Sequence, residues 1–307
     1  MTTTLPETGP RTTAPTIGFV GLGHMGGAMA GRLLAAGHPV VGTQRSRAGA
    51  EELLAHGLRW EATPRGVALT AEVVITSVPD DNALNAVASG PDGVLSALGA
   101  GKTWLEMSTV SPSTSRELAA EARVRGATML DAPVSGSVPQ AQAGTLTVMV
   151  GGEAGSYARV EPVLRTLGTP THVGSNGQGL VLKLAINISL AVQMLAFSEG
   201  LLLATRSGID RALALQVMAN SAIGSPMLKA RAPLVLDLPD DAWFSLGLME
   251  KDLRLARDVA RDLGVPLPTA DRADDVLGLA RVLGYENRDL AALYRLLEET
   301  SDGKAAA

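Results

Sequence analysis

The fold is decided by the stretch Ile17-Gly18-Phe19-Val20-Gly21-Leu22-Gly23-His24-Met25-Gly26. Its first four residues form an apolar run typical of a buried strand, and residues 28–36 have the apolar spacing of a helix. The glycines between them form a GxGxxG pattern, in which the first allows a tight turn, the second lets backbone approach a pyrophosphate and the third lets helix and strand pack closely. The sequence therefore predicts a dinucleotide site at the N-terminus of this helix.

The kind of dinucleotide follows from the end of the next predicted strand. NAD sites usually place Asp or Glu there, about 20 residues on, to bind the ribose 2′-hydroxyl. This chain instead reads Val41-Gly42-Thr43-Gln44-Arg45-Ser46-Arg47, and its next acid is Glu51. Because an arginine fork pairs well with a phosphate, the sequence favours NADP(H) over NAD(H). The predicted contacts are Gln44, Arg45 and Ser46, whereas Arg47 is either a further contact or a solvated residue at a helix start.

The chain changes character along its length. From Thr16 onward, short apolar runs alternate with helical segments, with strands expected at 17–20, 39–42, 73–77, 103–107, 128–131, 145–150 and 172–173. This alternation predicts a parallel sheet covered by helices on both faces. After residue 179 nearly every segment is helical in pattern. We therefore expect an unstructured segment at 1–15, an α/β domain at 16–178, an all-α domain at 179–300 and a flexible tail at 301–307.

Composition excludes several classes of protein. The 307 residues are 46% hydrophobic and 19% charged, which is enough apolar material for a sizeable core. A net charge of −5 argues against a nucleic-acid or anionic-membrane partner. The absence of cysteine excludes thiolate catalysis and cysteine metal sites, four histidines make another metal site unexpected, and a cysteine-free chain suits the cytoplasm.

The most apolar stretch runs from Leu180 to Ala204. Polar residues interrupt it at Lys183, Asn187, Gln193, Ser198 and Glu199. We therefore expect a long helix buried inside protein rather than a membrane span. A long apolar helix with aromatic residues at only 3% of the chain leaves surface to cover, which suggests a homodimer.

Four segments together are more specific than any single motif. They are 18–26 with Met29-Ala30; Asp131-Ala132-Pro133-Val134-Ser135-Gly136-Ser137 continuing through 144–146 and 149–152; Gly177-Gln178-Gly179 followed by Lys183 and Asn187; and Lys251-Asp252-Leu253. Over about residues 16–255, their order and spacing resemble the β-hydroxyacid dehydrogenases. That family contains 3-hydroxyisobutyrate dehydrogenase, tartronate semialdehyde reductase and the glyoxylate/succinic semialdehyde reductases. The resemblance implies a Rossmann-type doubly wound parallel sheet followed by an all-α domain, and an NAD(P)-dependent oxidoreductase.

The resemblance also implies roles for individual residues. Lys183 would be the catalytic lysine and Asn187 its partner on the same helix. Ser135 and Gly136 would hold a substrate carboxylate, together with Ser137, which stands where the family usually has a second glycine. The remaining matches place Val78 and Pro79 beside the cofactor, Thr109 beside the nicotinamide, and Lys251 at the nicotinamide end or the substrate.

The residues themselves agree with this chemistry. Lys183 and Asn187 are at i and i+4, hence on one face of a helix that is otherwise apolar. Burial lowers the pKa of a lysine toward neutrality, which suits a general acid/base. The predicted reaction is hydride transfer between nicotinamide and a small 3-hydroxy acid or its semialdehyde. The alternative to a catalytic role is a structural one, in which the methylene groups of Lys183 lie along the helix and its amine reaches water.

Three alternative functions, two enzymatic and one non-catalytic, would fit such a fold. An imine reductase shares the fold and the NADPH preference, but usually has aspartate or tyrosine where Lys183 stands. A 6-phosphogluconate dehydrogenase is disfavoured by chain length and by Ile186, where that family has histidine. A non-catalytic NADP-binding module would not need Lys183, Asn187 or Ser135.

Overall fold

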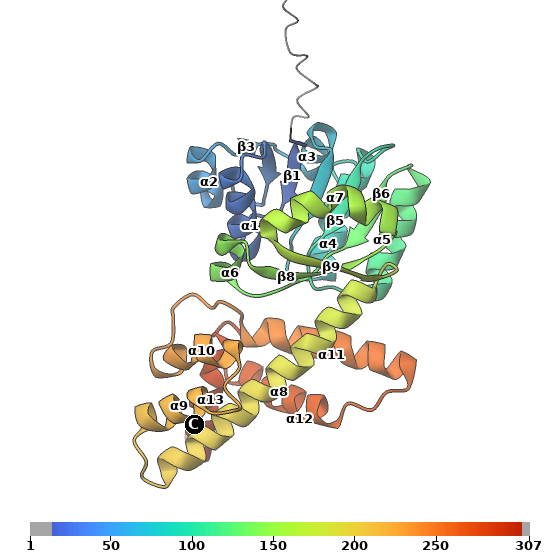
Figure 1. The fold of residues 1–307 in the computed structure, drawn as a ribbon. Coiled ribbons are helices and arrows are strands. Elements are labelled where there is room, and N and C mark those ends of the chain that lie inside the picture. Colours follow the sequence, from blue (N-terminus) through green and yellow to red (C-terminus); the bar gives the residue numbers. More distant parts are fainter. Residues whose placement is uncertain (1–13, 303–307) are drawn as a thin grey trace, which may run out of the picture.

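The computed structural model describes residues 14–302, and the predictions for residues 1–13 and 303–307 lie outside this range. An α/β part and an all-α part are joined by one long helix, α8 (Gln178–Arg206), which leaves the sheet and runs through the second part (Figure 1). The expected architecture, a helix-covered sheet followed by helices, is confirmed.

The nine strands that the structure describes form one sheet in the order β3-β2-β1-β4-β5-β6-β8-β7, with β9 paired to β8. The pairs from β3 to β6 are parallel, as predicted, but β8 runs antiparallel to β6 and β7, a reversal that the sequence analysis did not anticipate. The strands are β1 (Ile17–Val20), β2 (Val40–Thr43), β3 (Arg59–Trp60), β4 (Val73–Thr76), β5 (Thr103–Glu106), β6 (Thr128–Asp131), β7 (Val134–Ser135), β8 (Leu146–Gly151) and β9 (Gly168–Gly174).

Helices cover both faces of this sheet. One apolar cluster joins Phe19 and Leu105 to α1, α6 and α7, and another joins Val74 and Trp104 to α3, α4 and α5. Because β1 and β4 are buried on both faces, their side chains are apolar almost throughout. The helical segments are α1 (His24–Ala35), η1 (Arg47–Ala50), α2 (Glu51–Ala55), α3 (Pro64–Thr70), α4 (Asp81–Ala88), η2 (Val94–Ser96), α5 (Pro112–Val124), α6 (Val138–Ala143) and α7 (Ala154–Leu167).

The second part packs around α8. This helix packs against α9, α11, α12 and α13, and its Met194, Phe197 and Leu201 are buried. By length and composition alone α8 could cross a membrane, a test that the core helix of a folded domain also passes. The other elements are α9 (Arg211–Asn220), α10 (Pro226–Leu236), α11 (Leu246–Leu263), α12 (Pro268–Val282), η3 (Leu290–Ala292) and α13 (Leu293–Ser301).

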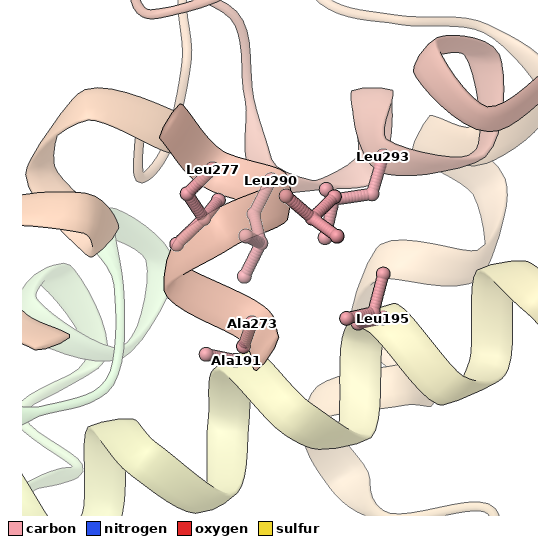
Figure 2. Close-up of a pocket in the computed structure, with 7 residues that line it drawn as sticks. Ala191, Leu195, Ala273, Leu277, Leu290 and Leu293 are labelled. Carbon is pink, nitrogen blue, oxygen red and sulfur yellow. The ribbon is translucent and has the colours of Figure 1, made fainter. Parts of the chain in front are cut away.

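A narrow apolar gap, too small to hold a water molecule, lies beside α8 in the second part. Figure 2 shows Ala191 and Leu195 of α8 facing Ala273 and Leu277 of α12, with Leu290 and Leu293 beside them. The lining offers no polar side chain to recognise a carboxylate or a phosphate. The gap is therefore a packing feature of the helical core, and the chemistry must lie elsewhere.

Candidate active site

The glycine-rich turn connects β1 to α1 at the carboxyl end of the sheet. Gly21 has φ +94°, and a Cβ there would lie 2.2 Å from the carbonyl oxygen of Ser77. A Cβ at Gly26 would lie 1.9 Å from the Gly21 carbonyl oxygen, so helix and turn are in backbone contact. A Cβ at Gly23, in contrast, would meet nothing within 4 Å, and no side chain within residues 14–302 caps the helix there. The open backbone and exposed N–H groups of this turn fit a pyrophosphate.

His24 and Met25 form the first turn of α1, and Leu22 is buried beneath the turn. At the end of β2, Arg45 and Ser46 are exposed, and within residues 14–302 Arg45 forms no ion pair. The Gln44 side chain turns back and donates to the Ser46 carbonyl at 2.8 Å. Arg47 lies 6.0 Å from the ring centre of Trp60, so it has a local partner of its own.

The start of α8 is fixed by a buried carboxylate. Asp131, at the end of β6, accepts hydrogen bonds from the N–H groups of Gly177 at 2.7 Å and Leu180 at 3.1 Å. Burial raises the pKa of Asp131, and these hydrogen bonds oppose the shift. Gly177 has φ +91°, and a Cβ at Gly179 would lie 2.5 Å from the Met149 carbonyl oxygen. The Gly-x-Gly sequence thus lets α8 begin in direct contact with the sheet.

One turn further along α8 lies a buried polar network. Lys183 Nζ donates to Asn187 Oδ1 at 3.0 Å, and Asn187 Nδ2 donates to Asp252 Oδ2 at 2.5 Å. The exposed fractions of the three residues are 9%, 1% and 1%. Asp252 belongs to α11, so the two helices hold the Asn187 amide in one orientation. The hydrogen bonds therefore run from Lys183 through Asn187 to Asp252, and the Lys183 amine is the terminal group of this network.

Electrostatics make this lysine unusual. Burial lowers the pKa of Lys183 to about 8; the negative charge of Asp252 opposes the shift, and the positive charges of Lys251 and Arg231 add to it. Arg231 is itself buried on α10, 3.6 Å from Asp289. An amine with a pKa near 8 exchanges a proton close to neutral pH, which an exposed lysine does not.

Lys251 connects the two parts of the molecule. Its Nζ lies 2.8 Å from Asp252 Oδ1 and also donates to the main-chain carbonyl of Thr109, in the segment that follows β5. The segment that follows β4 lies nearby, because the Val78 N–H donates to Ser108 Oγ at 2.9 Å. Thr109, Val78 and Pro79 therefore lie in adjacent segments at the carboxyl end of the sheet, where ligands of such sheets bind.

The predicted carboxylate loop follows β6. Ser135 ends β7, which contacts α8, and Gly136 has φ +131°, a conformation that favours glycine. The Ser137 hydroxyl donates to Gln140 Oε1 at 2.8 Å, and the Ser137 N–H donates to the same oxygen at 3.0 Å. Serine in place of the family's second glycine thus forms a local cap at the start of α6.

The structure brings Lys183, Asn187 and Lys251 together, and it places the glycine-rich turn and residues 44–46 at other points of the same sheet edge. Sequence reasoning gave no role to Asp252, Asp131 or Glu106, all buried. Asp131 and Asp252 both stood inside the quoted motifs. The available signal was an acid between the apolar Leu130 and Ala132 for Asp131, and the motif Lys251-Asp252-Leu253 itself for Asp252. Glu106 carried only the signal of a charged residue ending an apolar strand.

An open phosphate-binding turn and a buried lysine with a lowered pKa, both at the carboxyl end of a doubly wound sheet, define the class: a nicotinamide-dinucleotide oxidoreductase. Two family models match the chain. Residues 16–177 match the NAD-binding domain of 6-phosphogluconate dehydrogenase, and residues 177–297 match the NAD-binding domain of NADP-dependent 3-hydroxyisobutyrate dehydrogenase. The chain belongs to the β-hydroxyacid dehydrogenase family.

Individual relatives agree with this placement. The chain is 33% identical to 2-(hydroxymethyl)glutarate dehydrogenase of Eubacterium barkeri over 92% of this chain and 95% of the relative. The solved structure of 3-hydroxyisobutyrate dehydrogenase from Salmonella typhimurium superposes with a TM-score of 0.85 at 30% identity, covering 92% of this chain and 99% of that one. An imine reductase from Myxococcus stipitatus in complex with NADP+ reaches a TM-score of 0.59 at 22% identity over 92% and 100% of the two chains, a likeness that shows the fold alone.

Proposed function

We propose that the enzyme interconverts a small 3-hydroxy acid and its semialdehyde with NADP(H), and that Lys183 is the general acid/base. The observation that carries the proposal is the buried chain from Lys183 through Asn187 to Asp252. A lysine that merely covered a helix would have its amine in water, whereas Lys183 is 9% exposed. The two relatives are named for 2-(hydroxymethyl)glutarate and 3-hydroxyisobutyrate, which both carry a hydroxymethyl group beside a carboxylate.

Lys183 and Asn187 would have separate roles in the reaction. In oxidation the neutral amine of Lys183 takes the proton of the substrate hydroxyl, and in reduction its ammonium form returns that proton to the oxygen. Asn187, held by Asp252, keeps the lysine amine in place and offers an amide to the substrate oxygen. The bound cofactor supplies hydride acceptance or donation, which the protein itself cannot provide.

The loop after β6 is the proposed carboxylate site. Gly136 exposes backbone in a conformation that other residues rarely adopt, and Ser135 and Ser137 flank it with hydroxyl groups. β7 contacts α8, the helix that carries Lys183, and this contact supports a carboxylate site near the lysine. A carboxylate held there fits a small acid rather than a large neutral ketone.

The preference for NADP(H) is supported by the end of β2. Arg45 and Ser46 are exposed there, and no acid is present before Glu51 to bind a ribose 2′-hydroxyl. The glycine-rich turn, from Gly21 to Gly26, would hold the pyrophosphate. Val78, Pro79 and Thr109 would lie along the nicotinamide end.

A substrate panel tests the proposal. The purified enzyme is assayed in both directions with NADP and NAD against 3-hydroxy acids, short semialdehydes and a cyclic imine. We expect turnover of at least one hydroxy acid–semialdehyde pair and none of the imine. Imine reduction alone would assign the chain to the imine reductases instead, and NADPH binding without any turnover would indicate a binding module.

We also propose that the enzyme is a homodimer. Large apolar side chains are exposed on the second part, among them Leu203 of α8 at 74%, Val217 of α9 at 60% and Val282 of α12 at 73%. The concentration of exposed apolar side chains on the second part supports an interaction surface there. Sedimentation velocity at micromolar concentration should give twice the mass of the 31.6 kDa chain, and a purely monomeric profile would contradict the proposal.

A further inference from the structure

The carboxyl ends of the central strands carry a buried row of polar side chains. Thr76 of β4, Glu106 of β5 and Asp131 of β6 are in register with one another, so all three point to one face of the sheet. Thr76 accepts a hydrogen bond from the Trp104 indole, and Asp131 holds the start of α8. These two residues therefore have structural tasks that the fold explains.

Glu106 has a different set of partners. It is fully buried, and its Oε1 accepts a hydrogen bond from the Ser108 N–H at 2.7 Å. The Ser108 hydroxyl in turn accepts from the Val78 N–H at 2.9 Å. This two-step chain joins the segment after β5 to the segment after β4, and both segments stand at the expected nicotinamide end.

These contacts extend to the glycine-rich turn. A Cβ at Gly21 would lie 2.2 Å from the Ser77 carbonyl oxygen and 3.2 Å from Val78 Cγ1, so the segment after β4 packs directly on Gly21. From the other side, Lys251 reaches the Thr109 carbonyl from α11. Glu106 thus lies beneath the point where the two strand ends, the glycine-rich turn and the second part of the molecule meet.

Burying a carboxyl group in this position costs free energy, and stability alone gives no reason for it. Burial raises the pKa of Glu106 to about 8; hydrogen bonds from Ser108 oppose the shift, Asp131 adds to it and Lys251 opposes it. At pH 7 the group is mainly a neutral acid, and its Oε2 has no hydrogen-bond partner within residues 14–302. The Glu106 carboxyl group therefore serves the site as an uncharged acceptor for Ser108.

We propose that Glu106 is a positioning residue: through Ser108 it holds the segments that follow β4 and β5 in the one arrangement that accepts the nicotinamide half of the cofactor. The proposal rests on the proposed function, since it takes that half to bind there. It assigns Glu106 no contact with substrate and no proton transfer.

Binding measurements test this proposal without relying on turnover. The dissociation constants of NADPH and of 2′,5′-ADP, which lacks the nicotinamide half, are measured for wild type, Glu106→Leu, Glu106→Gln and Ser108→Ala. Glu106→Leu and Ser108→Ala should each weaken NADPH about tenfold, as for one lost hydrogen bond with partial rearrangement, while 2′,5′-ADP changes less than twofold. Glu106→Gln keeps the acceptor and should bind NADPH within about threefold of wild type.

Thr76→Val is the matched control, because it removes a buried hydrogen bond of the same row, the one from Trp104 within the sheet, and keeps the main-chain bond from Met107 to Thr76. It should lower Tm and leave the ratio of the two dissociation constants unchanged. The proposal is overturned if Glu106→Leu binds NADPH as wild type does, if NADPH and 2′,5′-ADP weaken equally, or if the double variant Glu106→Leu/Ser108→Ala shows the full product of the single effects. Ser108→Ala keeps the test decisive should Glu106→Leu not fold, and wild-type binding without turnover would count against the proposed function alone.

Discussion

The two parts of the molecule bring different groups to the place where they meet. Above its buried Glu106 and Asp131, the α/β part presents backbone groups to the site: the open turn at Gly23, the left-handed Gly136 and the carbonyl of Thr109. Helices α8 and α11 contribute buried titratable side chains, Lys183 and Asp252. Backbone groups suit binding of a constant cofactor, and a buried amine suits proton transfer. The comparison therefore predicts that variants in the first part alter cofactor affinity and variants in the second part alter kcat.

The two parts also differ in how many large apolar side chains they expose. Large exposed apolar side chains are scattered singly on the α/β part, as at Leu69 and Val124, but recur along α8, α9 and α12. The first part buries its apolar residues in two clusters on either face of its own sheet. The second part leaves apolar surface exposed, and we therefore propose that a homodimer interface would lie there.

The largest effect is expected at Lys183. Lys183→Ala should lower kcat by about 10²- to 10⁴-fold, the usual contribution of a positioned proton-transfer group. NADPH affinity should stay within about twofold, because most of the proposed cofactor contacts lie in the other part. Stopped-flow rates and fluorescence titration measure the two quantities, and Ser189→Ala, an exposed position on the same helix, is the control. A loss of NADPH binding equal to the loss of kcat would break the division between the parts.

A smaller effect is expected at Asp252. Asp252→Asn removes a charge that fixes Asn187 and pairs with Lys251. Loss of a charged hydrogen bond of this kind costs about 1.5–3 kcal/mol, which corresponds to roughly 10- to 100-fold in kcat. Because the Asp252 charge raises the pKa of Lys183, the pH profile of the variant should also move to lower pH. Asp258→Asn, on the surface of α11, should leave rate and profile unchanged, and an unmoved profile in Asp252→Asn would contradict the coupling.

Arg45 tests the expectation that variants in the α/β part alter cofactor affinity. Wild type should bind NADPH at least about tenfold more tightly than NADH, a difference of about 1.4 kcal/mol. Arg45→Ala should narrow the ratio of dissociation constants to less than about threefold and leave kcat at saturating cofactor nearly unchanged. Arg125→Ala alters net charge equally on a distant surface and serves as the control. Equal affinities in wild type, or a preference for NADH, would overturn the cofactor assignment.

The last prediction concerns stability, rather than activity, and Glu106. The folded carboxyl has a pKa of about 8 against an ordinary 4.5, so unfolding releases a proton between these values and stability from this group is lost as pH rises from about 4.5 to 8. Glu106→Gln cannot titrate. Urea denaturation should therefore find the stability of wild type, relative to the variant, falling from pH 5 to pH 8. A constant difference across this range would show that Glu106 ionises normally.

Much of the fold could be predicted because its signals are local. The glycine pattern and the short apolar runs placed most strands within one or two residues, as at β1 and β6. The helix after the glycine-rich turn begins at His24 rather than at residue 28, since the turn itself supplies its first residues. The antiparallel β8 was not predicted, because strand direction depends on how the short β7 pairs and leaves no mark in composition.

The site was predictable only in part. Lys183 and Asn187 share a helix face, so their i, i+4 spacing brought them together in the sequence. Asp252 lies 65 residues from Asn187 and joins it only because α11 packs against α8. Glu106 and Ser108 are two residues apart, yet their link to Val78 depends on the adjacency of β4 and β5. Contacts of this kind come from tertiary packing, which spacing alone does not reveal.

The most direct test of the central claim is the pH dependence of kcat/KM for hydroxy acid oxidation in wild type, Lys183→Arg and Glu106→Gln. Oxidation needs the neutral amine, so log kcat/KM should rise with unit slope and level near pH 8, where the pKa of Lys183 lies. Glu106 titrates in the same range, and Glu106→Gln should keep the bend if Lys183 causes it. Lys183→Arg, which cannot give up a proton near neutral pH, should lose at least about 100-fold in kcat and show no bend near pH 8. A Lys183→Arg enzyme that retained more than about half of the wild-type kcat, with the bend in place, would contradict the account.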